Sequence, residues 1–256
     1  MFNNNLRLKA AGIHFFFSLL VAAICAVMVF GLWYPYPYRA LSGGLELFTL
    51  IVTVDVVCGP LLTAVIFNPA KPKKELVRDL VLVAFIQLAA LTYGVYTLAQ
   101  ARPVYMVFEV DRFNVVSAVD VDEALLAKSP KQWSSLPFWG PEVISSREPK
   151  DGDERVQSID MSLEGVEPSM RPDWWENLSV SREKILQRSK PLADLRRRYK
   201  DKPAALQKIE SAVKDSGRSD SDLRWLPLTS SHNKDWTVLL DAKTAVPLAY
   251  APVDGF

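Results

Sequence analysis

Three long apolar runs in the first hundred residues restrict the fold of this chain more than any other feature. They cover residues 11–33, 46–67 and 79–99. About 20 consecutive, mainly apolar residues are enough for a helix to cross a lipid bilayer. Buried helices of a soluble protein are the weaker alternative, because three such runs would leave few polar faces. The sequence therefore predicts three transmembrane helices in an N-terminal membrane domain, residues 1–100.

Charged residues divide the chain at the same place. Of the 30 Lys and Arg residues, 7 lie in residues 1–99, and of the 29 Asp and Glu residues, 4 lie there. Residues 101–256 are therefore predicted to form a separate, water-exposed domain. The formal net charge of the whole chain is +1. This balance provides no general basic surface for nucleic acid.

The positions of Lys and Arg also predict how the membrane domain is oriented. Cytoplasmic loops carry an excess of these residues. Arg7 and Lys9 precede the first run, and only Arg39 lies between the first and the second. The loop between the second and third runs carries four: Lys71, Lys73, Lys74 and Arg78. The N-terminus is therefore predicted in the cytoplasm, and the C-terminal domain in the periplasm of a Gram-negative cell.

Aromatic residues gather in two parts of the chain. The stretch WYPYPY contains Trp33, Tyr34, Tyr36 and Tyr38, and it is typical of an aromatic belt at the outer membrane face. In the second domain, four tryptophans are candidates for core or interface anchors: Trp133, Trp139, Trp174 and Trp175.

The periplasmic domain alternates between strand-like and helix-like segments. Residues 104–110 and 114–119 are rich in β-branched and aromatic residues and predict two strands. Asp120 is predicted to cap a short helix. Helices broken by prolines follow between residues 181 and 217, and three strands end the chain. The pattern predicts an α+β domain with a small, mainly antiparallel sheet, and it assigns no element to residues 129–180.

Asp55 lies in the middle of the second apolar run, and Gly59 and Pro60 follow it closely. An ionisable residue there costs about 2.5–3.5 kcal/mol on insertion scales and is a functional hypothesis by default. Pro60 has no N–H to donate to the carbonyl of Val56, so it is predicted to kink the helix. Gly59 lets a neighbouring helix approach closely. The stretch is predicted to be a kinked surface at which a partner helix docks.

Three polar residues of the third run are candidate partners for Asp55. Thr92 and Tyr93 are predicted at a similar depth in the bilayer, and Gln87 about one turn deeper. A hydrogen bond from one of them would hold the two helices together. Three roles for Asp55 stay open here: a clamp between helices, a docking point for another membrane helix, and a proton or ion site.

The sequence contains no catalytic, cofactor or metal motif. It has no Walker loop, dinucleotide fingerprint, zinc spacing or calcium loop. His14 is predicted to meet solvent or headgroups at the membrane surface, and His232 to lie in a turn. Cys25 and Cys58 both fall in apolar runs and predict small buried side chains rather than a disulfide. We therefore expect a protein that binds or assembles, not an enzyme, with no cofactor and no metal.

Several segments together resemble one family, the type IV pilin accessory proteins of the TfpX/TfpZ family. The likeness is dense over residues 6–120, and it is carried by RLKAAGIHF (7–15), WYPYPY (33–38), VDVVCGPLLTAVIFNPAKPKKEL (54–76), IQLAALTYG (86–94) and ARPVYMVFEVDRF (101–113). It is looser beyond, at RWLPL (224–228) and WTVLLDAKTAVPLA (236–249). Members often end in an Asp-Pro-Trp type of tail, whereas this chain ends PVDGF.

The resemblance implies an inner-membrane accessory factor, a chaperone or assembly modulator that supports pilus biogenesis, surface piliation and twitching motility. The implied partners are the membrane helix and periplasmic head of a type IV pilin, with other pilus assembly components. Two alternatives stay open. One is a subunit of an ion-coupled membrane complex that uses Asp55. The other is a membrane sensor whose periplasmic domain binds a ligand, although the short cytoplasmic segments argue against it.

Overall fold

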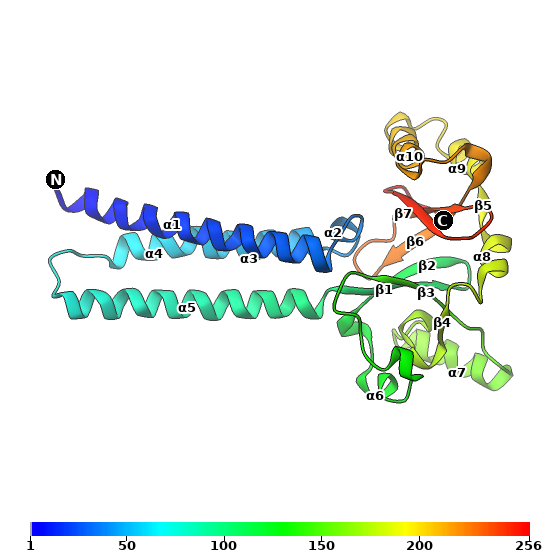
Figure 1. Cartoon of the computed structure of the whole chain (residues 1–256), viewed down its shortest axis with the longest axis horizontal. Helices are drawn as coiled ribbons and strands as arrows, with labels where there is room; N and C mark the ends of the chain where they lie inside the picture. Colours follow the sequence, from blue (N-terminus) through cyan, green and yellow to red (C-terminus); the bar gives the residue numbers. More distant parts are fainter. Residues whose placement is uncertain (1) are drawn as a thin grey trace. The chain divides into compact units, whose positions relative to one another are not determined.

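The computed structural model describes residues 2–256, and it divides into two compact units. The first unit ends at Ala101, and the second spans Arg102–Phe256. Figure 1 shows that the first is built from helices alone, whereas the second combines a sheet with short helices.

Three helices of the first unit are long and apolar enough to cross a membrane, so the prediction of three such helices is confirmed. They cover Asn4–Trp33, Gly44–Ile66 and Lys73–Gln100. Two of them contain a wider π-helical turn. The elements in order are α1 (Phe2–Met28), the π-helical turn η1 (Val29–Trp33), α2 (Tyr38–Leu41), α3 (Gly44–Thr53), the π-helical turn η2 (Val54–Cys58), α4 (Gly59–Ile66) and α5 (Lys73–Gln100).

The helices of the first unit lie side by side in Figure 1. Helix α1 packs against α4, and α5 packs against both α3 and α4. Small residues allow the close contacts. A Cβ atom on Gly94 of α5 would lie 2.7 Å from Cγ2 of Ile51 in α3, so only glycine fits there. Small residues at helix contacts are how membrane helices approach one another.

The prediction of an aromatic belt is wrong for three residues of WYPYPY, because Trp33, Tyr34 and Tyr38 are buried. Trp33 and Tyr34 are buried in a cluster with Val29 and Leu98, and the Tyr34 hydroxyl donates to the Leu98 carbonyl at 3.1 Å. Tyr36 is exposed. The stretch closes one end of the helix bundle, and large aromatic side chains fill the space between the helix ends.

The second unit is built on one eight-stranded sheet with the order β4-β3-β1-β2-β6-β7-β8, and β5 pairs with β6. The strands are β1 (Pro103–Glu109), β2 (Arg112–Ser117), β3 (Glu142–Ser146), β4 (Trp175–Asn177), β5 (Lys190–Pro191), β6 (Leu223–Ser230), β7 (Trp236–Asp241) and β8 (Pro247–Ala251). The helices are α6 (Glu123–Leu126), α7 (Gly152–Leu163), α8 (Arg182–Arg188), α9 (Leu192–Arg198) and α10 (Pro203–Ser216).

The sheet is mixed, which corrects the expectation of a small, mainly antiparallel sheet. The hairpin β1–β2 and the meander β6–β7–β8 are antiparallel. However, β1 pairs with β3 in parallel, and β2 pairs with β6 in parallel. The parallel pairs join strands that long connections separate, as parallel pairing requires. The local alternation of apolar and polar residues therefore predicts the antiparallel hairpins. It does not predict the parallel strand pairs that join the hairpins into one sheet.

Two apolar cores cover different parts of this sheet. One lies between α9, α10 and strands β6 to β8 and includes Trp225, Ile209 and Leu239. The other surrounds β1 and β3 and includes Trp133 and Trp175. Figure 1 shows α9 and α10 near the β6–β8 end of the sheet and α6 and α7 near β4.

Two local predictions need correction or completion. The cap of α6 is Asp122, not Asp120, because the Asp122 carboxylate accepts from the N–H groups of Ala124 and Leu125. Asp120 accepts instead from the N–H of Ser117, three residues earlier. The stretch 129–180 contains β3, α7 and β4.

Candidate functional site

Asp55 lies in the π-helical turn η2, at the point where α3 and α4 meet. Pro60 is one of the first residues of α4, where a missing N–H is tolerated. The wider turn takes up the break in the helical ladder that a proline imposes. The kink expected at Pro60 stays a prediction, and the structure has a π-helical turn (Val54–Cys58) that includes Asp55 and ends just before Gly59 and Pro60.

Gln87 of α5 is joined to Asp55. Its Nε2 donates to the Asp55 carbonyl oxygen at 3.2 Å and to the Asp55 carboxylate oxygen Oδ1 at 3.4 Å. Gly59 makes room for this amide, because a Cβ atom there would lie 1.8 Å from Gln87 Nε2. Asp55, Gly59 and Gln87 therefore form one contact between η2, α4 and α5.

The other two candidate partners are not brought to Asp55 by a hydrogen bond. Thr92 donates to the Leu88 carbonyl of its own helix at 2.6 Å. Tyr93 is 72% exposed. Within residues 2–256, neither side chain donates to Asp55, although Tyr93 and Asp55 line a common cavity of about 220 Å³.

His14 is a site residue that the sequence reasoning misplaced. It was expected at solvent or headgroups, but its Nδ1 lies 2.6 Å from Oγ1 of Thr63 in α4. Thr63 and Ser18 are buried. His14 and Ser18 are four residues apart and so share one face of α1. That spacing was the available signal, and the partner Thr63 is distant in the sequence.

A second cavity of about 220 Å³ is lined by the polar residues His14, Ser18, Asp55 and Gln87. Its remaining walls are apolar. The lining residues are His14, Phe17, Ser18, Val21, Asp55, Ala84, Gln87, Leu88 and Leu91. Helix α1, turn η2 and helix α5 each contribute, so the cavity is a feature of the packed bundle.

The Asp55 carboxylate can accept more hydrogen bonds than it receives. Oδ1 accepts from Gln87, and Oδ2 accepts no hydrogen bond from any residue in the described range 2–256. A carboxylate group offers about four acceptor positions. The arrangement is therefore a polar acceptor set in apolar walls, suited to a helix that carries a donor or a cation.

Comparison with known proteins places the whole chain in a family. It is 36% identical to the fimbrial assembly protein of serogroup I of Dichelobacter nodosus, over 97% of this chain and 95% of that protein. The chain belongs to the fimbrial assembly protein family. A second member, of serogroup E1, is 35% identical over the same shares, and the protein of serogroups C1 and C2 is 49% identical over 44% of this chain and 86% of its own length.

The family model of the fimbrial assembly protein FimB matches residues 3–43, which lie in the first unit. The match to the serogroup I relative covers both units. No solved structure matches the chain. These relatives bear the name of fimbrial assembly rather than that of pilin accessory proteins, and the two descriptions are compatible.

Proposed function

We propose that this chain is an inner-membrane accessory factor for the assembly of type IV fimbriae, and that it acts by binding the fimbrial subunit, the pilin, rather than by catalysis. The observation that carries the proposal is similarity over 97% of the chain to two proteins named for fimbrial assembly. The resemblance of residues 6–120 to pilin accessory proteins points the same way.

The proposed orientation follows from charge. The connection from α4 to α5 carries Lys71, and the start of α5 adds Lys73, Lys74 and Arg78, whereas the segment between α1 and α3 carries Arg39 alone. Positive loops stay in the cytoplasm. The second unit then belongs in the periplasm, where a subunit awaiting assembly presents its head.

In this proposal the subunit's membrane helix docks at the cavity beside Asp55. A subunit before assembly keeps an apolar helix in the inner membrane and a globular head in the periplasm, so a factor with three spans and a periplasmic domain meets both parts. The apolar walls suit the helix, and Oδ2 of Asp55 offers it an acceptor. The second unit would hold the head and give specificity. A chaperone of this kind supports surface fimbriae and twitching motility.

The direct test is photo-crosslinking in living cells. A photoreactive residue replaces Val21 or Leu88, which line the cavity. Matched controls carry it at Val65 or Val81, which are exposed on α4 and α5 and line neither of the two cavities beside Asp55. We expect a crosslink to the fimbrial subunit from the two cavity positions and not from the controls, and Asp55→Ala should weaken it. Equal crosslinking from all four positions contradicts docking at the cavity.

A second candidate is a subunit of an ion-coupled complex, and the shared cavity of His14 and Asp55 favours it. Two ionisable groups in a membrane cavity are typical of proton pathways. In that case this chain would support fimbrial assembly only while proton-motive force is present. Asp55→Asn would then abolish this support without reducing binding of the fimbrial subunit.

A further inference from the structure

A groove of about 210 Å³ lies in the second unit, between α7 and α8. Arg155 and Ile159 line it from α7, and Lys184 and Arg188 from α8. Its floor is formed by the ends of β1 and β3 and by Trp174. It is separate from the Asp55 cavity, which lies in the first unit.

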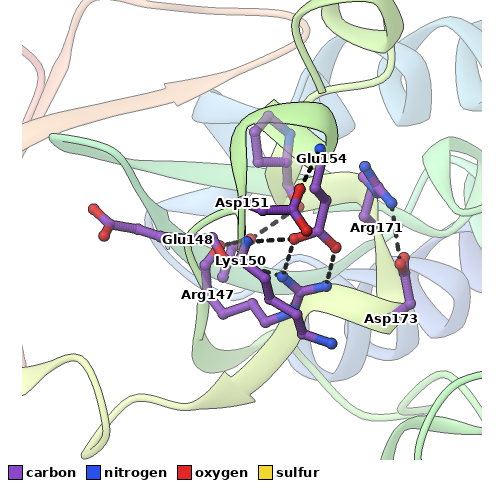
Figure 2. A network of polar contacts seen from close by, with 9 residues as sticks. Arg147, Glu148, Lys150, Asp151, Glu154, Arg171 and Asp173 are labelled. Carbon is purple, nitrogen blue, oxygen red and sulfur yellow. Dashed lines mark hydrogen bonds and ion pairs between the residues drawn. The ribbon is translucent and has the colours of Figure 1, made fainter. Parts of the chain in front are cut away.

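The lining of this groove carries more positive charge than the protein itself neutralises. Two of its four cationic side chains have partners. Arg147 is bound by Glu154 through two hydrogen bonds of 2.8 and 2.7 Å, drawn face to face in Figure 2. Lys184 pairs with Glu148 at 2.5 Å.

Arg155 and Arg188 are the surplus cations. Neither side chain makes a hydrogen bond or an ion pair with any residue in the part of the chain that the structure describes. Both are exposed. Lys184 lowers the pKa of the Glu148 carboxyl most, and Arg155 and Arg188 lower it further. Both guanidinium groups are thus close enough to act on a carboxylate at the groove.

The acidic residue in the floor does not neutralise them. Glu109 is only 1% exposed, accepts from the Ser169 N–H at 2.9 Å and pairs with Arg112 at 3.3 Å. Burial raises the pKa of this carboxyl, with desolvation as the main cause. Its acceptor capacity is committed to residues other than Arg155 and Arg188.

Trp174 lines the groove beside Arg147. The side chain is buried, and the guanidinium carbons of Arg147 and Arg171 lie 4.7 and 4.2 Å from the centre of its ring. Its indole N–H is buried and meets no acceptor within the described chain. Arg147 is thus held by Glu154 and by the Trp174 ring, which leaves Arg155 and Arg188 as the surplus cations of the groove.

The groove also offers apolar contact. Ile159 is exposed on α7, and Val110 is exposed at the turn between β1 and β2. Val110 has φ +50°, which is strained for a β-branched residue. The two-residue turn between β1 and β2 accounts for this conformation, because such hairpin turns place a central residue at positive φ. Val110 therefore presents an aliphatic side chain in the groove that Arg155 and Arg188 also line.

We propose that this groove binds an acidic segment of a partner protein, whose carboxylates pair with Arg155 and Arg188 and whose apolar side chain contacts Ile159 and Val110. Charge complementarity selects the occupant, and the apolar lining favours a peptide over a bare anion. This inference goes beyond the proposed function and does not require the partner to be a fimbrial subunit.

The test uses the full chain in nanodiscs of zwitterionic lipid. The probe is a fluorescein-labelled peptide of alternating Asp, Glu and Leu, and binding is followed by anisotropy at low salt. Its counterpart of Asn, Gln and Leu is the uncharged control. The double variant Arg155→Gln with Arg188→Gln is compared with Lys150→Gln with Arg182→Gln. The second pair removes the same charge from exposed positions next to the groove that do not line it.

We expect the acidic peptide to bind and the neutral one not to. The groove variant should lose at least about tenfold in affinity, the loss of one charged hydrogen bond, while the control variant stays within about twofold. Near-UV circular dichroism checks that both variants remain folded. The proposal is overturned if both variants lose affinity equally. It is also overturned if inorganic phosphate competes as well as the peptide, or if the protein instead binds vesicles of phosphatidylglycerol through the same two arginines.

Discussion

The amide of Gln87 donates to the carbonyl and to the carboxylate of Asp55 together, at 3.2 and 3.4 Å. This contact joins the third long helix to the π-helical turn in the second. It exists because residue 59 has no side chain. The same contact leaves one carboxylate oxygen free toward a cavity, so a structural clamp and a docking point are compatible roles for Asp55.

Gly59→Ala is expected to break this contact without separating the helices. The new Cβ would overlap the flexible end of Gln87, and that end can move away. The stability lost should be about 0.6–2 kcal/mol, as for other hydrogen bonds between membrane helices. Gln87→Leu should lose a similar amount, and the double variant little more, because both changes remove one interaction.

Thermal unfolding in detergent measures these variants. Gly12→Ala is the matched control, because nothing lies within 4 Å of a Cβ there. A double variant that loses the sum of the two single effects would show that Gly59 and Gln87 act independently.

Trp175→Ala is expected to destabilise the second unit by about 3–5 kcal/mol, as for large buried aromatic residues. The Trp175 ring lies 4.5 Å from that of Tyr105, and its indole N–H donates to the Ser169 carbonyl at 2.7 Å. Trp139 is 64% exposed, so Trp139→Ala should change stability by less than about 0.5 kcal/mol. Denaturant unfolding followed by fluorescence decides, and equal losses would contradict the assignment of the core.

Glu109 makes stability fall as pH rises. Burial raises the pKa of its carboxyl above the ordinary 4.5, so the folded state keeps this proton at pH values where the unfolded state has lost it. Stability therefore decreases from about pH 4.5 up to the folded pKa. Glu109→Gln removes this decrease. Melting temperatures measured across that pH range should fall in the parent protein and stay flatter in the variant, and parallel curves would contradict the claim.

Glu154 has the opposite effect. Hydrogen bonds from Arg147, followed by one from the Lys150 backbone N–H, lower the pKa of the Glu154 carboxyl to about 2. The stability from this pair is complete above the ordinary value of 4.5 and is lost as pH falls from there toward about 2. The variant Glu154→Gln should not show this loss of stability as pH falls. Asp153→Asn, one residue earlier in α7 and exposed, is the matched control. Its stability should change with pH as that of the parent protein does.

The features that the sequence predicted are those that depend on neighbours in the chain. A run of apolar residues specifies a spanning helix by its length, and residues 104–110 specify a strand by their composition. The parallel pair of Asn114 with Thr229 joins strands more than a hundred residues apart, and no local pattern contains it. Strand β4 has only three residues, too few for an alternation to appear.

The site was predictable to the same extent. Counting helix rise placed Thr92 and Tyr93 at the depth of Asp55 and Gln87 about one turn deeper, yet of these three it is Gln87 that donates to Asp55. The contact between His14 and Thr63 depends on how α1 packs against α4, which sequence periodicity does not specify. The π-helical turn was also beyond prediction, because a proline alone does not determine which kind of turn absorbs the break.

The central claim is that this chain acts in fimbrial assembly after the subunit has been made. The most direct measurement is a deletion of its gene, with total fimbrial subunit and sheared surface fimbriae quantified in the same cells. The account predicts that total subunit is kept while surface fimbriae fall, and that the intact gene restores them. Unchanged surface fimbriae in cells that make the cognate subunit would contradict it.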